Sequence, residues 1–106
     1  LGDVYKRQGA HYAATKGAIV TLTKIFAKEF AAKGVTVNAV APGPMESPIV
    51  HSVVPDEKME QFIQNIPVKA LGSMHFIAET CGLLASPNAG FVTGATWDIN
   101  GGLFMR

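Results

Sequence analysis

A short apolar stretch, residues 35–41, places the strongest constraint on the fold of this chain. It is rich in β-branched residues and is bounded by Gly34 and Pro42. A strand of this composition is covered on both faces, which is typical of a parallel sheet flanked by helices. Asn38 lies within the stretch, so we expect a buried amide group whose hydrogen bonds are made with the backbone.

The segment before this strand has the spacing of an amphipathic helix. Its large apolar residues recur every three or four positions, which predicts an inward face made of Ile19, Leu22, Phe26 and Phe30. We expect the helix to begin at His11 or Tyr12 and to end at Gly34, where glycine adopts a left-handed cap at little cost. A helix, a capped turn and a buried strand together form half of an α/β repeat.

The remaining sequence predicts three more helices and a final strand. Two short helical stretches lie within residues 49–66 and are broken at Pro55, with Asp56 as the N-cap of the second stretch. Ser73 is expected to cap a helix over residues 74–85. The inward residues of that helix are predicted to be Ile77, Cys81 and Leu84. A short strand is expected over residues 95–99.

Composition and charge narrow the class of protein. The 106 residues are 48% hydrophobic and 16% charged, which is typical of one globular unit and excludes a disordered chain. A net charge of +1 offers no electrostatic case for nucleic acid or for a membrane surface as a partner. The lone cysteine, Cys81, excludes an intrachain disulfide and is expected to be a buried, inert thiol. With no signal peptide and no membrane-length apolar run, we expect a cytoplasmic protein.

The first eight residues, 1–8, do not fit the pattern of the rest of the chain. They have no clear period and run into Gly9 without a turn signature, so we interpret them as a non-native, adapter-like remnant. The alternative is a native strand end or loop. With either interpretation, we expect the chain to begin in the middle of a domain.

Tyr12 and Lys16 are the strongest candidates in the sequence for residues that take part in a reaction. They are four positions apart and therefore share one helical face. An ammonium group close to a phenol stabilises the phenolate, which prepares the phenol for proton transfer. The alternative is a tyrosine at a helix start followed by a solvated lysine.

The loop after the first strand, residues 42–48, is the second candidate. Loops at the carboxyl ends of parallel strands bind ligands in open α/β sheets. Gly43 lets a flat group approach the backbone closely, and three prolines restrict the freedom of the loop. The alternative is a rigid turn with no ligand.

The spacing of these motifs resembles the short-chain dehydrogenase/reductase family. The combination consists of Tyr12-Ala13-Ala14-Thr15-Lys16, Val37-Asn38-Ala39-Val40-Ala41-Pro42-Gly43, and Thr93-Gly94 followed by Asn100-Gly101-Gly102. It is most similar to the branch that reduces 3-oxoacyl-(acyl-carrier-protein) and acetoacetyl-CoA. The resemblance implies an α/β fold, with residues 9–106 forming the C-terminal portion of a doubly wound parallel-sheet Rossmann fold, its last two strands and their flanking helices.

The resemblance also implies roles for particular residues. Tyr12 matches the catalytic acid/base and is also implied to be one of the cofactor-binding residues. Lys16 matches the lysine that activates this tyrosine and holds the nicotinamide ribose. For cofactor binding, Pro42 and Gly43 match the turn against the nicotinamide ring. The backbone of Met45 matches the group that holds the carboxamide, and Ser47 stands in place of a threonine whose hydroxyl assists there. No metal site is implied.

The implied activity is NAD- or NADP-dependent interconversion of a ketone and a secondary alcohol, with 3-oxoacyl thioester reduction as the first expectation. The alternatives are a dehydrogenase of a sugar or other small alcohol, and a non-catalytic fragment. The resemblance places the Gly-rich phosphate-binding turn, the residue that selects NAD or NADP, and the catalytic serine upstream of this sequence. It also implies a homotetramer for the complete protein.

Overall fold

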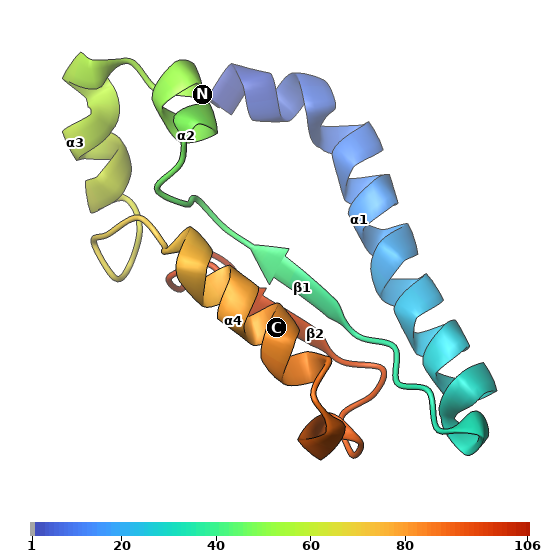
Figure 1. The fold of residues 1–106 in the computed structure, drawn as a ribbon. Helices are drawn as coiled ribbons and strands as arrows, with labels where there is room; N and C mark the ends of the chain where they lie inside the picture. The colour runs from blue at the N-terminus through green and yellow to red at the C-terminus, as the bar shows by residue number, and fades with distance from the viewer. Residues whose placement is uncertain (1) are drawn as a thin grey trace. The chain divides into compact units, whose positions relative to one another are not determined.

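The computed structural model describes the backbone of residues 2–106 and the side chains of residues 10–106. Four α-helices, two 3-10 helices and two strands follow one another as α1 (Gly2–Phe30), η1 (Ala31–Lys33), β1 (Ala39–Pro42), α2 (Pro48–Val53), α3 (Asp56–Gln64), α4 (Met74–Leu84), η2 (Pro87–Ala89) and β2 (Thr96–Ile99) (Figure 1). The chain divides into two compact units. The first comprises Leu1–Ala39 and Leu83–Trp97, and the second comprises Val40–Gly82 and Asp98–Arg106.

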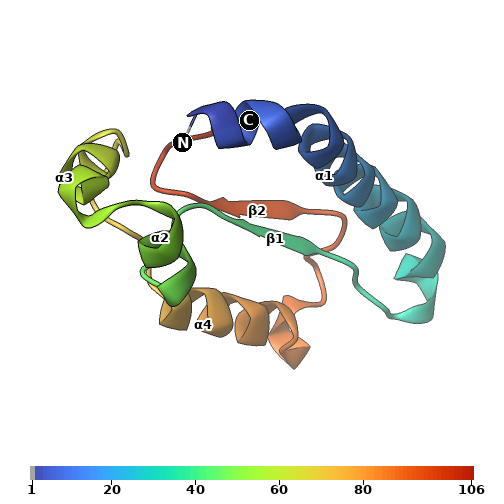
Figure 2. The ribbon, with the colours of Figure 1, turned by 90° about the horizontal axis from the view of Figure 1, so that it is seen from above.

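Strands β1 and β2 lie side by side in a two-stranded sheet (Figure 2). The Ala39 N–H donates to the Ala95 carbonyl at 2.9 Å, and the Gly43 N–H donates to the Ile99 carbonyl at 2.8 Å. Because both partners advance in the same direction, the pairing is parallel, and the connection between the strands runs through helices. The predicted α/β class, with two parallel strands and flanking helices, is confirmed.

The first strand is shorter than predicted and begins at Ala39 rather than Val35. Just before β1, the Asn38 side chain makes hydrogen bonds to the backbone in place of the backbone–backbone hydrogen bonds of paired strands. Its Nδ2 donates to the Val92 carbonyl at 2.9 Å, and its Oδ1 accepts from the Ala95 N–H at 3.1 Å. The predicted backbone partners of this amide are confirmed, but Asn38 is half-buried and not buried as predicted. The same bonds explain the later start of β1.

Helix α1 begins at Gly2, so the start predicted at His11 or Tyr12 is wrong. Gly9 does not stop the helix, because one interior glycine costs only about 1 kcal/mol relative to alanine. The strand end or loop considered for the first residues is not observed, since the backbone is helical from Gly2. Whether residues 1–8 are native stays a prediction, because Leu1 and the side chains of residues 2–9 lie outside the described part.

The end of this helix follows the sequence closely. After Phe30 the last turn tightens into η1, and Gly34 caps it in the left-handed conformation with φ 79°. The Gly34 N–H donates to the Ala31 carbonyl at 3.0 Å. The predicted glycine cap is therefore confirmed.

The buried face of α1 differs from the predicted one. Ala27, 3% exposed, and Thr23, 6% exposed, are buried, whereas Ile19, Leu22 and Phe26 are exposed. A Cβ built at Gly94 would lie 3.4 Å from the Cβ of Ala27, so α1 packs within its unit through small side chains. The large apolar residues occupy an adjacent strip of the helix.

In the second unit, α2 and α3 are separated at Pro55, as predicted. Asp56 is the first residue of α3, and Pro55 takes the N-cap position without a side-chain hydrogen bond, so the predicted Asp56 cap is wrong. Proline's fixed φ already directs the chain into the helix. Ile66, at 2% exposure, is the most buried large side chain among the described residues.

Helix α4 begins at the predicted place. The Ser73 hydroxyl accepts from the Phe76 N–H at 3.3 Å, which confirms the predicted cap. Cys81 is exposed, so its predicted burial is wrong. The buried residue is Thr80, one position earlier. Its hydroxyl donates to the Phe76 carbonyl at 2.8 Å, so the polar group is satisfied where it is buried.

Candidate active site

Tyr12 and Lys16 lie together on one face of α1. The Lys16 Nζ lies 5.3 Å from the centroid of the Tyr12 ring, within the range of a cation–π contact. Tyr12 is 51% exposed. The first unit therefore presents a phenol and an ammonium group as one exposed pair, with the spacing that the sequence predicts.

The second unit holds the other candidate residues, in the loop after β1. Gly43 lies at the strand end, where a Cβ would come within 2.6 Å of the Cβ of Asn100. Glycine is thus required by the close approach of Asn100, a reason that the loop sequence alone does not give. The preceding Pro42 ends β1 and is exposed.

Met45 forms an isolated parallel bridge with Gly72. The bonds of this bridge come from the flanking residues. The Gly72 N–H donates to the Pro44 carbonyl at 2.9 Å, and the Glu46 N–H donates to the Gly72 carbonyl at 2.8 Å. In a parallel bridge of this kind the N–H and carbonyl of the central residue point to the opposite edge. The backbone of Met45 is therefore directed away from Gly72, while its side chain is buried.

Ser47 follows on the same loop and precedes α2 as its N-cap residue. Its hydroxyl is half-buried and donates to the Met45 carbonyl at 3.2 Å. The serine oxygen retains its acceptor capacity in this bond. Within the second unit, the structure thus brings together Gly43, Met45 and Ser47, which were predicted to contact one ligand.

These groups fit a nicotinamide cofactor in chemical type. The carboxamide of a nicotinamide ring needs backbone and hydroxyl partners, which the loop offers at Met45 and Ser47. A ribose offers hydroxyl groups that an exposed ammonium such as Lys16 can donate to.

A cavity of about 340 Å³ lies in the second unit beside this loop. Its wall is mainly apolar and includes Pro44, Met45, Leu71, Phe76 and Ile99. Gly72 is also part of it, and a Cβ there would come within 2.5 Å of the Met45 sulfur. Sequence reasoning missed the contribution of Gly72 and Asn100. The signal for Gly72 was its place just before the Ser73 cap, and for Asn100 the two glycines that come directly after it.

Two further findings concern the described part of the chain. It contains no cluster of three or more histidine, cysteine, aspartate or glutamate side chains suited to a metal ion. None of its helices combines the length and the apolar character needed to cross a membrane.

A family model described as enoyl-(acyl carrier protein) reductase matches residues 2–104, nearly the whole chain. The chain belongs to the short-chain dehydrogenase/reductase family. Curated relatives support this assignment. The 3-oxoacyl-[acyl-carrier-protein] reductase FabG of Staphylococcus aureus (strain Mu50) is 44% identical over 105 residues, which cover 99% of this chain and 42% of the relative. FabG of Vibrio cholerae is 41% identical over 105 residues, which cover 99% of this chain and 43% of the relative.

A third relative, FabG of Staphylococcus epidermidis (strain RP62A), is 44% identical over 96 residues, covering 91% of this chain and 39% of the relative. This short-chain dehydrogenase/reductase chain therefore spans about two fifths of the length of the curated relatives that it matches. Its membership confirms the resemblance that the Tyr12–Lys16 motif and the loop after β1 indicated.

Proposed function

We propose that the complete protein containing this chain is an NAD- or NADP-dependent oxidoreductase that reduces the ketone of a 3-oxoacyl thioester to a secondary alcohol. The observation that carries the proposal is the 41–44% identity to 3-oxoacyl-[acyl-carrier-protein] reductases. The exposed Tyr12–Lys16 pair supports it, because carbonyl reduction needs a proton donor and a neighbouring ammonium stabilises the phenolate that remains.

In this mechanism Tyr12 is the catalytic acid. A reduced nicotinamide held by Lys16 and the loop after β1 would supply the hydride that adds to the carbonyl carbon. As the new C–H bond forms, the Tyr12 hydroxyl donates its proton to the carbonyl oxygen, so that the C=O double bond becomes a C–O single bond. Lys16 stabilises the phenolate that remains and donates hydrogen bonds to the ribose hydroxyls. In the reverse direction the Tyr12 phenolate accepts the alcohol proton.

The loop after β1 has the second role, which is to orient the cofactor. Pro42 and Gly43 would form the surface against the nicotinamide ring. The Met45 backbone and the Ser47 hydroxyl would bind the carboxamide, an assignment supported by the direction of the Met45 backbone relative to its bridge with Gly72. Orientation of this kind lowers the barrier because the reacting atoms are already aligned.

The substrate class can be tested by comparing three compounds with the complete protein. We would supply a 3-oxoacyl thioester, a 2-enoyl thioester and a ketose, each with NADH and with NADPH, and measure kcat/KM from cofactor oxidation. The proposal predicts that the 3-oxoacyl thioester is used at least about tenfold more efficiently than the others, a difference of about 1.4 kcal/mol. Preference for the ketose would favour a sugar dehydrogenase. No turnover with any compound would favour a non-catalytic protein.

Removal of the Ser47 hydroxyl should weaken cofactor binding. We expect Ser47→Ala to raise the cofactor Kd about fivefold, because one hydrogen bond is worth about 1 kcal/mol. Ser47→Thr should be nearly neutral, since it keeps the hydroxyl. Fluorescence titration with reduced nicotinamide measures both. Ser52→Ala is the matched control, because the Ser52 hydroxyl donates to the Ile49 carbonyl at 2.8 Å on the same helix. An unchanged Kd in Ser47→Ala would refute the role of this loop.

We further propose that the complete protein forms a homotetramer in which residues 91–105 lie at a subunit interface. Phe91 is fully exposed, and Phe104 and Met105 are also exposed. Large apolar side chains exposed at a protein surface are candidates for an interaction site.

Phe91→Asp should therefore dissociate the assembly without disturbing the subunit. The phenyl group is fully exposed, so its replacement removes no packing within its unit, while a buried charge at an interface costs several kcal/mol. Sedimentation velocity of the complete protein should show smaller species for this variant. Asn88→Asp, an exposed position in η2, should sediment like the parent. A Phe91→Asp protein with the parental sedimentation coefficient would exclude this residue from the interface.

A further inference from the structure

We propose that Asn100 is a positioning residue for cofactor binding, acting through Gly43. This inference rests on the proposed function and names a residue outside the catalytic motif and outside the loop that contacts the cofactor. Asn100 follows β2, and its Cα and Cβ lie directly against Gly43. A Cβ built at Gly43 would be 2.7 Å and 2.6 Å from these two atoms.

The Gly43 backbone makes two contacts with the segment that contains Ile99 and Asn100. Its N–H donates to the Ile99 carbonyl at 2.8 Å, and its Cα faces the Cα and Cβ of Asn100 without an intervening side chain. A displacement of Asn100 would therefore move Gly43 directly, because packed backbone has no room to absorb the shift. The position of the turn at Pro42 and Gly43, which we assign to the nicotinamide ring, therefore depends on the conformation of the segment that begins at Asn100.

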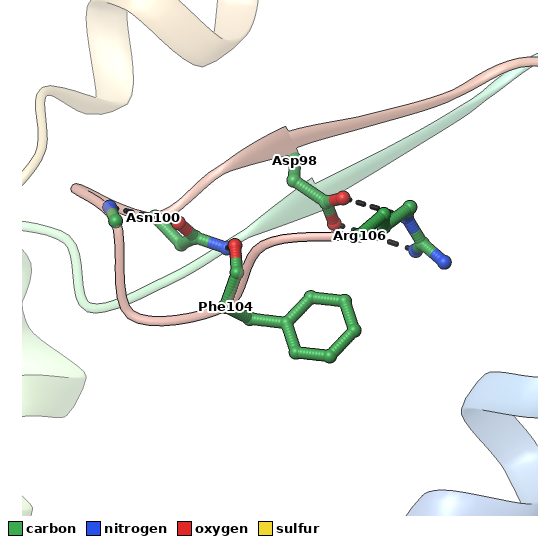
Figure 3. Close-up of polar contacts among 5 residues, drawn as sticks. Asp98, Asn100, Phe104 and Arg106 are labelled. Carbon is green, nitrogen blue, oxygen red and sulfur yellow. Dashed lines mark hydrogen bonds and ion pairs between the residues drawn. The ribbon is translucent and has the colours of Figure 1, made fainter.

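The Asn100 side chain fixes that conformation through both ends of its amide. Its Oδ1 accepts from the Gly102 N–H at 3.0 Å, and its Nδ2 donates to the Phe104 carbonyl at 3.0 Å (Figure 3). Gly101 and Gly102 have φ values of 65° and 92°, which other residues rarely adopt. The amide thus ties together a turn whose backbone would otherwise have many alternatives.

Contacts on the far side of the turn hold it in place. The Val68 N–H donates to the Gly101 carbonyl at 3.1 Å, and a Cβ at Gly101 would come within 2.8 Å of Ile66, the most buried large side chain of the described residues. Asp98 pairs with Arg106, with 2.6 Å between Oδ2 and Nε, and so closes the segment beyond the turn (Figure 3). Asn100 is therefore set between an anchored turn and the Gly43 backbone.

The test uses the complete protein and measures cofactor Kd by fluorescence titration, together with kcat and KM for a 3-oxoacyl thioester. Asn100→Ala should raise the Kd for the preferred nicotinamide about five- to tenfold, the effect of losing one or two hydrogen bonds. At saturating cofactor, kcat should stay within about twofold of the parent, and the thioester KM should not change. Asn100→Asp keeps the acceptor for the Gly102 N–H and should show a smaller rise. Asn88→Ala should match the parent.

A merely structural role predicts a different pattern. In that case Asn100→Ala would lower the thermal unfolding midpoint while its folded fraction kept the parental Kd, and this result would overturn the inference. If Asn100→Ala does not yield folded protein, Asn100→Asp decides, because a Kd equal to that of the parent would refute the role. A parent protein that binds no nicotinamide would refute the proposed function itself, whereas equal binding by parent and variants refutes only the role of Asn100.

Discussion

Replacement of Tyr12 by phenylalanine in the complete protein should lower kcat by roughly 10²–10⁴, the usual contribution of a general acid. The variant keeps the aromatic ring against which the Lys16 ammonium lies at 5.3 Å and removes only the hydroxyl. The side chain is half-exposed and the change is small, so stability should be nearly unaffected. Cofactor Kd should change much less than kcat, because the lost hydroxyl acts chiefly on the substrate oxygen.

Steady-state kinetics at saturating cofactor measure this effect. Thr21→Val is the control, since it removes an exposed hydroxyl from the same helix without touching the Tyr12–Lys16 pair. Near-normal turnover in Tyr12→Phe would remove Tyr12 from the mechanism and leave the exposed pair without its assigned role.

The 106-residue chain by itself should bind neither NADH nor NADPH measurably and should have no reductase activity. Its core is small, since the buried apolar residues in the described part of the chain are limited to Ala27, Met45, Val50, Val54, Ile66 and Ala89. The apolar strip of α1 formed by Ile19, Leu22 and Phe26 is about half exposed, so each of these side chains forgoes part of the roughly 1.5–3 kcal/mol that full burial contributes. Whole domains are stable by only about 5–15 kcal/mol, so losses of this size are decisive.

We therefore expect a purified chain of these residues to be aggregation-prone or partly molten. Titration with NADPH and NADH, followed by nicotinamide fluorescence, tests the binding, and near-ultraviolet circular dichroism tests for fixed tertiary packing. The complete protein, treated identically, is the control. A saturable signal from the 106-residue chain in the micromolar range would show that it contains a sufficient cofactor site, contrary to this prediction.

Features governed by neighbours in the sequence were predictable. The left-handed cap at Gly34, the Ser73 cap of α4 and the break at Pro55 each follow from the conformational preference of one residue. The proximity of Tyr12 and Lys16 likewise follows from helical spacing alone.

Features that depend on contacts between residues far apart in the sequence were not predictable. Helical periodicity identifies an apolar strip but does not show which part of the helix another element covers. The burial of Ala27 rather than Phe26 on α1 could therefore not be predicted. The same reason explains why Thr80 is buried and Cys81 is exposed on α4. The need for glycine at Gly43 comes from Asn100, which lies far along the chain, so no local pattern could reveal it.

Isotope transfer tests the central claim, nicotinamide-dependent ketone reduction with Tyr12 as proton donor, most directly. The complete protein would receive a 3-oxoacyl thioester and a reduced nicotinamide carrying deuterium at both hydrogens of its C4, and the product would be examined by mass spectrometry. We expect a 3-hydroxyacyl product with a single deuterium at the carbinol carbon, formed much more slowly by Tyr12→Phe. A product without deuterium, or equal rates for the parent and Tyr12→Phe, would contradict it.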